Sequence, residues 1–275
     1  GTATDGYFDT ETTGQSGAGG LATAALQAAL QANFGSAAWG ILPGVSYPYL
    51  KWRFPTGPSV VSGKAVDIAG GNDRLGVGLG IDGNLAAYRH TGANGYYSFM
   101  VDPAAADSSA LTWLTGERFS GATTTSRANA VGEMPTSGLG GFPQGMASGL
   151  DLYADTVNVK TALPKYSDIA AMMDRALYGD GSGAPLYDQV PDSGVFLYDT
   201  SPCGCGASVD VSFYPGNPGP QASLRLDASA PLLTWDGAFD PTLPARNLTI
   251  LAAGDVLVTS GNGIGAEDIN DAGGG

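Results

Sequence analysis

Few side chains in this sequence could carry out covalent chemistry. The chain has one histidine, His90, and two cysteines, Cys203 and Cys205. A serine or cysteine nucleophile needs a neighbouring base, which is most often histidine. His90 falls at the end of an expected strand, just before a turn, where a solvated histidine is the ordinary interpretation. Gly-x-Ser-x-Gly, His-Glu-x-x-His and phosphate-loop motifs are also missing from the sequence. We therefore expect a protein that is not an enzyme.

A single glycine separates Cys203 from Cys205. A pair this close can be two free thiols, a strained local disulfide, or half of a metal site. A second cysteine pair is missing and His90 is distant in sequence, so we do not expect a tetrahedral zinc site within the chain.

Paired carboxylates could hydrolyse glycans. The candidate pairs are Asp151 with Asp155 and Asp236 with Asp240. We expect both pairs in loops or at exposed strand ends, and no aromatic groove pattern surrounds them. Solvated surface is the better interpretation of these acids.

Calcium is the one ion that the loop sequences favour. Gly70-Gly71-Asn72-Asp73 and Asp180-Gly181-Ser182 offer oxygen ligands in Gly-rich turns, with Asn72, Asp73 and Asp180 as the candidate ligands. The Gly-Gly-x-Gly-x-Asp repeat of calcium-binding β-rolls is missing. We expect no cofactor other than a possible Ca²⁺.

Composition restricts the partners. The chain has 12 basic and 26 acidic residues and a formal charge of −14, so we do not expect a nucleic-acid partner, which needs a basic surface. Its 43 glycines follow no Gly-X-Y period, which excludes collagen. No apolar run is long enough to span a bilayer. Because the chain starts almost inside a motif and ends in glycines, we expect a segment of a longer protein.

The stretch Gly6–Trp52 organises the chain. A Gly-rich turn and an Ala/Leu/Gln pattern around Ala24–Leu30 predict a short helix. Large apolar side chains then follow, and these could anchor the helix on a folded neighbour: Phe34, Trp39, Ile41, Tyr47, Tyr49 and Leu50.

Three separated motifs in this stretch resemble the GLUG-type module of filamentous-haemagglutinin-like bacterial adhesins. They are the opening Tyr7–Gly14, with Phe8 where tryptophan is usual, the helix start Gly20–Ala24, and the close Ser46–Trp52. The match covers about the first fifth of the chain. The resemblance implies an extracellular, non-catalytic module on a parallel β-helix stalk.

The following residues predict a small antiparallel sandwich. Leu75–Ile81 alternates apolar residues with glycine, and Leu85–His90 and Tyr96–Val101 read as further strands joined through Asp-Gly-Asn and Asn-Gly turns. Gly76, Gly78 and Gly80 should thin one face so that another group can pack closely. Val61–Asp67 and Thr91–Phe99 resemble carboxypeptidase-regulatory-like or Ig-like modules.

Two patterns remain. Ser167–Tyr178 predicts a helix with Ser167 as N-cap and an apolar stripe that consists of Ile169, Met172, Met173, Ala176 and Leu177. Ser223–Trp235 aligns with Asn247–Thr259 at an offset of 24 residues, so that Leu224 matches Leu248 and Leu226 matches Ile250. We interpret this repeat as two rungs of a parallel β-helix. Two unrelated hairpin strands are the alternative.

The sequence thus predicts an all-β fold: parallel β-helix segments with an inserted antiparallel β-sandwich and one or two short helices. The expected divisions are a β-helix-capping module (1–55), a sandwich (59–165), a connector (166–206) and β-helix rungs (207–275).

The expected function is a structural or adhesive segment of a large secreted bacterial surface protein, in contact with glycans, matrix or other copies of itself. The alternatives are a subunit of a self-assembling extracellular filament and, third, a carbohydrate-active β-helix enzyme.

Overall fold

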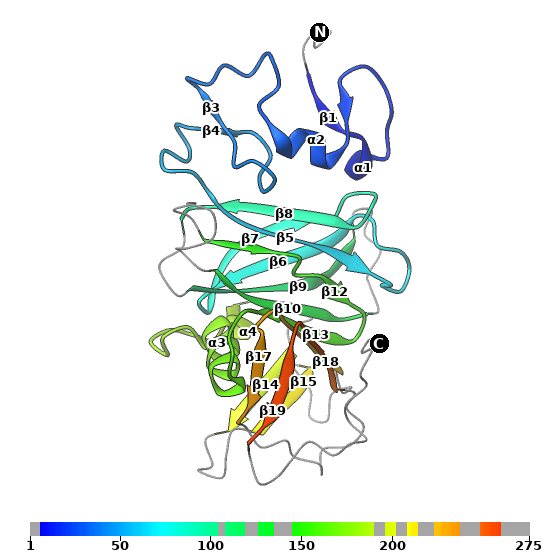
Figure 1. The fold of residues 1–275 in the computed structure, drawn as a ribbon. Helices are drawn as coiled ribbons and strands as arrows, with labels where there is room; N and C mark the ends of the chain where they lie inside the picture. Colours follow the sequence, from blue (N-terminus) through cyan, green and yellow to red (C-terminus); the bar gives the residue numbers. More distant parts are fainter. Residues whose placement is uncertain are drawn as a thin grey trace.

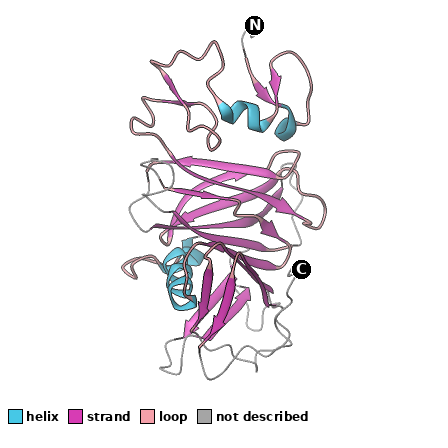
Figure 2. Cartoon of the chain, in the orientation of Figure 1, coloured by secondary structure: helices cyan, strands magenta, loops and turns pink. Residues whose placement is uncertain are grey.

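The chain folds mostly into strands, as expected (Figure 2). A computed structural model describes residues 6–103, 108–118, 126–134, 145–189, 196–201, 208–213, 223–236 and 248–259. An N-terminal module lies at one end, two stacked sheets form the middle, and a helix with short strand pairs lies beyond them (Figure 1). None of the helices in these ranges combines the length and apolar character of a membrane span.

The N-terminal module, residues 6–52, has little regular structure. Its two strand pairs are parallel β1–β2 and antiparallel β3–β4. Its elements are β1 (Phe8–Asp9), α1 (Thr10–Thr13), β2 (Gly20–Leu21), α2 (Thr23–Ala28), β3 (Trp39–Gly40) and β4 (Tyr49–Leu50). The helix expected around Ala24–Leu30 is α2, and only Leu26 of it is buried.

The smaller sheet is built around one central strand, β5. Strand β8 pairs with it antiparallel, while β11 and β12 pair with it in parallel. The strands of this sheet are β5 (Ser59–Val66), β8 (Tyr96–Val101), β11 (Met146–Ser148) and β12 (Leu152–Tyr153).

The larger sheet has seven strands in the order β18-β16-β13-β10-β9-β6-β7. Pairing is parallel from β18 to β10 and antiparallel from β10 to β7. Its strands are β6 (Leu75–Ile81), β7 (Asn84–His90), β9 (Ser108–Arg118), β10 (Ala128–Met134), β13 (Thr156–Thr161), β16 (Ser223–Ala228) and β18 (Leu248–Ala252).

The two sheets pack face to face, and this corrects one expectation. A buried cluster that includes Val61, Leu79, Phe99 and Leu114 fills the space between them. The sandwich is therefore present, but its sheets are mixed rather than antiparallel. Parallel pairs such as β5–β11 join residues more than 80 positions apart. Such pairs have no hairpin turn between them, so the turn sequences could not predict them.

The expected thinning of β6 by glycine is confirmed. A methyl group on Gly78 would overlap the ring of Trp113, and one on Gly80 would overlap Leu186. Trp113 is fully buried, so the missing side chains make room for core groups.

The second core lies on the other face of the large sheet. Helix α3 (Tyr166–Tyr178) packs there together with the short helix α4 (Leu186–Gln189). All five predicted stripe residues of α3 are buried. The helix starts one residue earlier than expected, and Lys165 rather than Ser167 takes the N-cap position. The large sheet and this core include residues on both sides of the boundary expected at residue 165. The segment 166–206, expected to be a connector, therefore contributes core residues.

The predicted repeat is found in the register of the last strands. Leu224 pairs with Leu248 and Leu226 with Ile250, the expected offset of 24. Beside them, β17 (Leu232–Trp235) pairs in parallel with β19 (Asp255–Val258). There Leu233 pairs with Val256, an offset shorter by one than the sequence alignment predicts. Strands β14 (Phe196–Ser201) and β15 (Ser208–Phe213) form a separate antiparallel pair. The described residues thus form mixed sheets with short parallel ladders, and they do not show a parallel β-helix.

Candidate functional site

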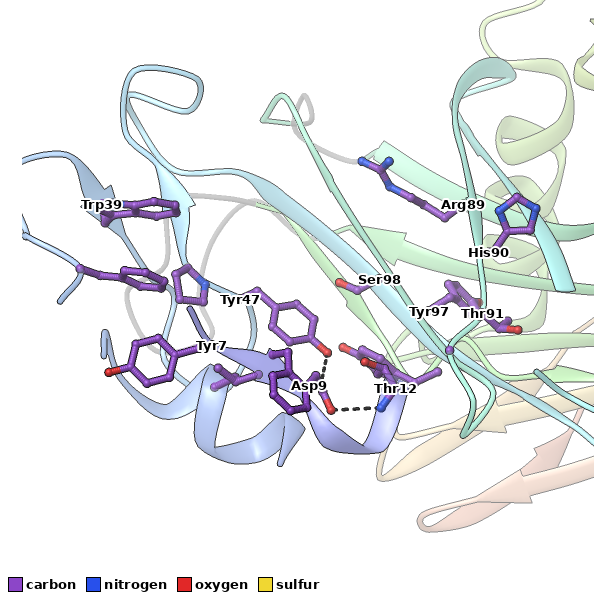
Figure 3. A pocket seen from close by; sticks show the side chains of 16 residues that line it. Tyr7, Asp9, Thr12, Trp39, Tyr47, Arg89, His90, Thr91, Tyr97 and Ser98 are labelled. Atoms are coloured by element: carbon purple, nitrogen blue, oxygen red, sulfur yellow. Dashed lines mark hydrogen bonds between the residues drawn. The ribbon is translucent and has the colours of Figure 1, made fainter. Parts of the chain in front are cut away.

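A cleft lies between the N-terminal module and the sandwich (Figure 3). Its volume is about 450 Å³, within the range of about 300–1,000 Å³ usual for small-molecule sites. Aromatic residues of the module line one side, and the ends of β7 and β8 line the other. Its main lining side chains are Tyr7, Phe8, Asp9, Phe34, Trp39, Tyr47, Arg89, His90, Tyr96 and Ser98.

One buried carboxylate, that of Asp9, holds the module together. Its Oδ1 accepts hydrogen bonds from the backbone N–H groups of Glu11 and Thr12, at 2.9 and 3.1 Å. Its Oδ2 accepts from the hydroxyls of Thr23 and Tyr47, each at 2.6 Å. The backbone bonds make Asp9 the N-cap of α1. Asp9 therefore joins all three motifs that resemble the adhesin module.

These bonds determine the charge of Asp9. Burial alone would raise the pKa of its carboxyl group, but the donors on Thr23, Tyr47, Thr12 and Glu11 outweigh burial and hold the pKa below its usual value. Burial and the neighbouring Asp9 raise the pKa of Tyr47. At neutral pH the pair is therefore a carboxylate that accepts and a phenol that donates. With four hydrogen bonds already accepted, Asp9 is poorly placed to act as a base.

The module is docked on the turn between β7 and β8. The backbone N–H of Ala93 donates to the carbonyl of Thr12 at 2.6 Å. The Gln27 amide donates to the hydroxyl of Tyr96 at 3.0 Å. A methyl group on Gly92 would overlap Thr12, so the close approach requires glycine there. The two walls of the cleft are thus held at a fixed separation.

The aromatic wall of the cleft is a stack. The rings of Phe34 and Trp39 are nearly parallel, with centroids 4.5 Å apart and planes 13° apart. Tyr7 meets Phe34 edge to face at 5.7 Å. Trp39 and Phe34 are only partly buried. The module therefore presents a rigid, partly exposed apolar surface to the cleft.

The opposite wall is polar. Arg89 and His90 are exposed at the end of β7, and Ser98 lies on β8 (Figure 3). The Oγ atom of Ser98 is buried and has no hydrogen-bond partner among the described residues. Buried hydroxyls are normally paired, so water or a ligand is a candidate partner for this atom. The arrangement is suited to binding a ligand that has both an apolar face and polar edges.

A second cavity, of about 590 Å³, lies between the large sheet and α3. Two of its three described charged lining residues, Glu133 and Arg175, have structural roles, and the third is Asp168 of α3. Glu133 accepts from the Thr161 hydroxyl at 2.9 Å and the Ala162 N–H at 2.7 Å. Arg175 pairs with Asp82 at 2.8 Å. Glu133 and Arg175 are thus already committed, whereas the first cleft combines an aromatic wall with a polar one, so the first cleft is the better candidate.

The calcium candidates are not brought together. The Asn72 side chain accepts from the N–H of Ile68 at 2.9 Å, and Asp180 accepts from the N–H and hydroxyl of Ser182 at 2.9 and 2.6 Å. Asp73, adjacent to Asn72, lies in the same loop. Across the ranges that the structure describes, no group of three or more His, Cys, Asp or Glu residues is arranged to hold a metal ion. Cys203 and Cys205 lie outside the described residues.

The described members of the acid pairs considered for glycan hydrolysis accept hydrogen bonds from backbone N–H groups elsewhere in the chain. Asp151 accepts from the N–H of Lys64 at 2.8 Å, and Asp155 from that of Arg127 at 3.4 Å. Asp236 accepts from Ser167 at the start of α3, and Asp240 lies outside the described residues. His90 was expected at a solvated strand end; it is exposed there and also lines the cleft.

Sequence reasoning did not find the cleft. The sequence did contain a signal for its N-terminal wall, because Asp9, Thr23 and Tyr47 each belong to one of the three adhesin-like motifs. Their convergence on one carboxylate could not be inferred without the fold. Arg89 and Ser98 lie in ordinary strand patterns and carry no signal of their own.

No protein family, curated protein or solved structure matches this chain. The resemblance to adhesin modules therefore rests on the three motifs alone.

Proposed function

We propose that this chain is a non-catalytic structural and adhesive segment of a large secreted bacterial surface protein, located outside the cell. Two features support the proposal. The three N-terminal motifs resemble an adhesin module and converge on Asp9. The last strands also stack in the manner of solenoid rungs.

The parallel pairing of the last strands is the main support for the proposed stalk. Strands β16 and β17 lie in parallel register on β18 and β19, so that two consecutive strand pairs repeat one above the other. A parallel bridge between Lys165 and Thr234 extends the second ladder to the segment that follows β13. At the corner, a methyl group on Gly254 would overlap the carbonyl of Pro231, as expected for tightly stacked turns. We interpret the three layers as rungs of a parallel β-helix, the architecture of an elongated stalk.

Electron microscopy combined with sedimentation velocity tests this function. We expect an elongated monomer whose sedimentation coefficient does not change with concentration. A compact, globular monomer contradicts the stalk. Assays on a panel of polysaccharides test the non-catalytic character, and cleavage of any of them would favour the third alternative, a carbohydrate-active enzyme.

A filament subunit is the second candidate, favoured by one observation. Leu232 on β17 and Val256, Leu257 and Val258 on β19 are 37–50% exposed, and β19 belongs to the outermost described rung. Strand β18 is also the edge of the large sheet. An apolar surface beside an unpaired strand edge favours association between copies.

Variants at the two edges of the molecule test the filament. We expect Leu257→Ser to abolish any concentration-dependent association. Leu85→Ser, on the opposite edge strand β7 and 38% exposed, is the matched control. Association that persists in Leu257→Ser contradicts assembly through this rung.

A further inference from the structure

We propose that the cleft between the N-terminal module and the sandwich binds a pyranose ring of a surface glycan. This assignment deepens the adhesive function proposed above and rests on it for its biological role. Three features of the cleft itself support the site: an aromatic stack, a buried hydroxyl with no partner among the described residues, and few basic side chains in the lining.

The aromatic wall supplies the apolar contact. Phe34 and Trp39 are stacked at 4.5 Å, and Tyr7 meets Phe34 edge to face, so the ring positions are fixed before a ligand arrives. The face of an aromatic ring carries partial negative charge. The C–H groups on one face of a pyranose carry partial positive charge and lie nearly in a plane. Such a face can stack on Trp39 without rearrangement of the protein.

The polar wall supplies the hydrogen bonds. A pyranose stacked by one face projects its hydroxyls sideways, toward groups at the rim of the ring. The Ser98 Oγ is buried and has no partner among the described residues, and the Arg89 guanidinium is exposed on β7, the strand that precedes β8 in the chain (Figure 3). A sugar hydroxyl can accept from Arg89, and it can donate to Ser98 once the serine side chain rotates toward the cleft. A purely apolar ligand would leave the serine hydroxyl unpaired, at a cost in affinity.

Charge narrows the class of ligand. The chain carries a net charge of −14, and the ionised Asp9 lines the cleft. A polyanion, such as a sulfated glycan or a nucleic acid, would be repelled by this charge. One arginine, Arg89, and one histidine, His90, in the described lining are too few basic side chains for a polyanion site. The geometry therefore favours a neutral sugar.

Because both walls contribute, the ligand bridges two parts of the fold. The module supplies Trp39 and Tyr47, and the sandwich supplies Arg89 and Ser98. A ligand that contacts both walls stabilises the docked arrangement over any arrangement in which the module has separated. Binding should therefore slow amide exchange at the contacts between Thr12 and Ala93.

The test uses the whole chain and the methyl glycosides of glucose, galactose and N-acetylglucosamine as probes. Saturation-transfer NMR and isothermal titration would detect binding, and we expect a Kd near the millimolar range for a single ring, about −4 kcal/mol. We expect Trp39→Ala to weaken binding about tenfold or more. Trp52→Ala is the matched control, since Trp52 is a tryptophan of the same module, 74% exposed and outside the cleft.

Variants on the polar wall separate loss of the site from loss of the fold. Ser98→Ala and Arg89→Met leave the aromatic stack in place, and each should also weaken glycoside binding while amide exchange in the free protein stays unchanged. Equal binding by Trp39→Ala and Trp52→Ala would overturn the location of the site. Binding of an extended peptide along β7, with no glycoside binding, would overturn the ligand class.

Failure of this inference and failure of the proposed function can be distinguished. An elongated monomer that binds none of the glycosides overturns the sugar site and leaves the stalk. A compact particle that binds a glycoside through Trp39 supports the site, while the stalk fails.

Discussion

The hydroxyl of Tyr47 donates a 2.6 Å hydrogen bond to Oδ2 of Asp9, 38 residues earlier in the chain. The same oxygen accepts from the Thr23 hydroxyl, also at 2.6 Å. These bonds close the N-terminal module, which has short strands and a single buried residue in α2. A module with so little regular structure depends on such polar ties for its shape.

The first prediction concerns this bond. Tyr47→Phe removes one donor to a buried carboxylate and should destabilise the module by about 1.5–3 kcal/mol. Amide exchange measured over residues 6–52 would report the change, with faster exchange at Thr12 and Thr23. Tyr49→Phe is the control, because Tyr49 lies in the same module and is not a partner of Asp9. Equal effects of the two variants would contradict the role of the Asp9–Tyr47 bond.

The second prediction is that acid loosens the N-terminal module. Hydrogen bonds hold the pKa of Asp9 below its usual value of 3.8, so the ionised form stabilises the folded module. This contribution is complete above about pH 4 and is lost as the pH falls through the lower pKa of the folded state. Exchange at the Glu11 and Thr12 amides, which donate to Oδ1 of Asp9, should therefore rise at strongly acidic pH.

Asp9→Asn is the control for the pH experiment. It should exchange faster at neutral pH and should lose the acid-dependent step at the Glu11 and Thr12 amides. Asp180 and Asp236 also have lowered pKa values, but they lie far from Glu11 and Thr12 in the chain and affect other segments. An unchanged acid step in Asp9→Asn would assign it to another group.

Patterns that depend on neighbouring residues could be predicted from the sequence. The alternation in Leu75–Ile81 gives β6 with its observed bounds, and the same holds for Tyr96–Val101 and β8. The 24-residue offset gives the register of β16 with β18, because inward side chains must repeat when strands stack. The offset fails by one residue at β17 and β19, because the sequence does not fix how many residues the intervening corner uses.

Relationships between distant residues could not be predicted. Strand β5 pairs with β11 and β12, far along the chain, so the sandwich is mixed. The cleft depends on the docking of the module on Gly92 and Ala93, and no local pattern encodes that contact. Ser167 was expected to cap α3, but Asp236 binds Ser167 instead, from a strand end 69 residues away.

The third prediction tests the close packing on β6. Gly78→Ala places a methyl group in the space of the Trp113 ring, so we expect about 1–3 kcal/mol of destabilisation in chemical unfolding. Gly183→Ala is the control, since a methyl group there meets nothing within 4 Å. A Gly78 variant as stable as the Gly183 variant would show that Trp113 can move aside at no cost.

The last prediction concerns the start of α3. The carboxylate of Asp236 accepts from the backbone N–H of Ser167 at 2.9 Å and from its hydroxyl at 2.8 Å. This bond pair satisfies a free N–H at the helix start and joins α3 to the end of β17. Asp236→Ala should cost about 0.5–2 kcal/mol, as the loss of an N-terminal helix cap does.

Asp180→Ala offers a chemically matched control. Asp180 makes the same two bonds, to the N–H and hydroxyl of Ser182, but within an exposed turn. Its removal should leave the free energy of unfolding nearly unchanged, as substitutions at exposed positions usually do. Equal costs for the two variants would contradict a role of the Asp236 bonds in joining α3 to the end of β17. A larger cost for Asp236→Ala means that these bonds couple the helix to the stacked strands, and this coupling is what would keep α3 in place as the ladder extends.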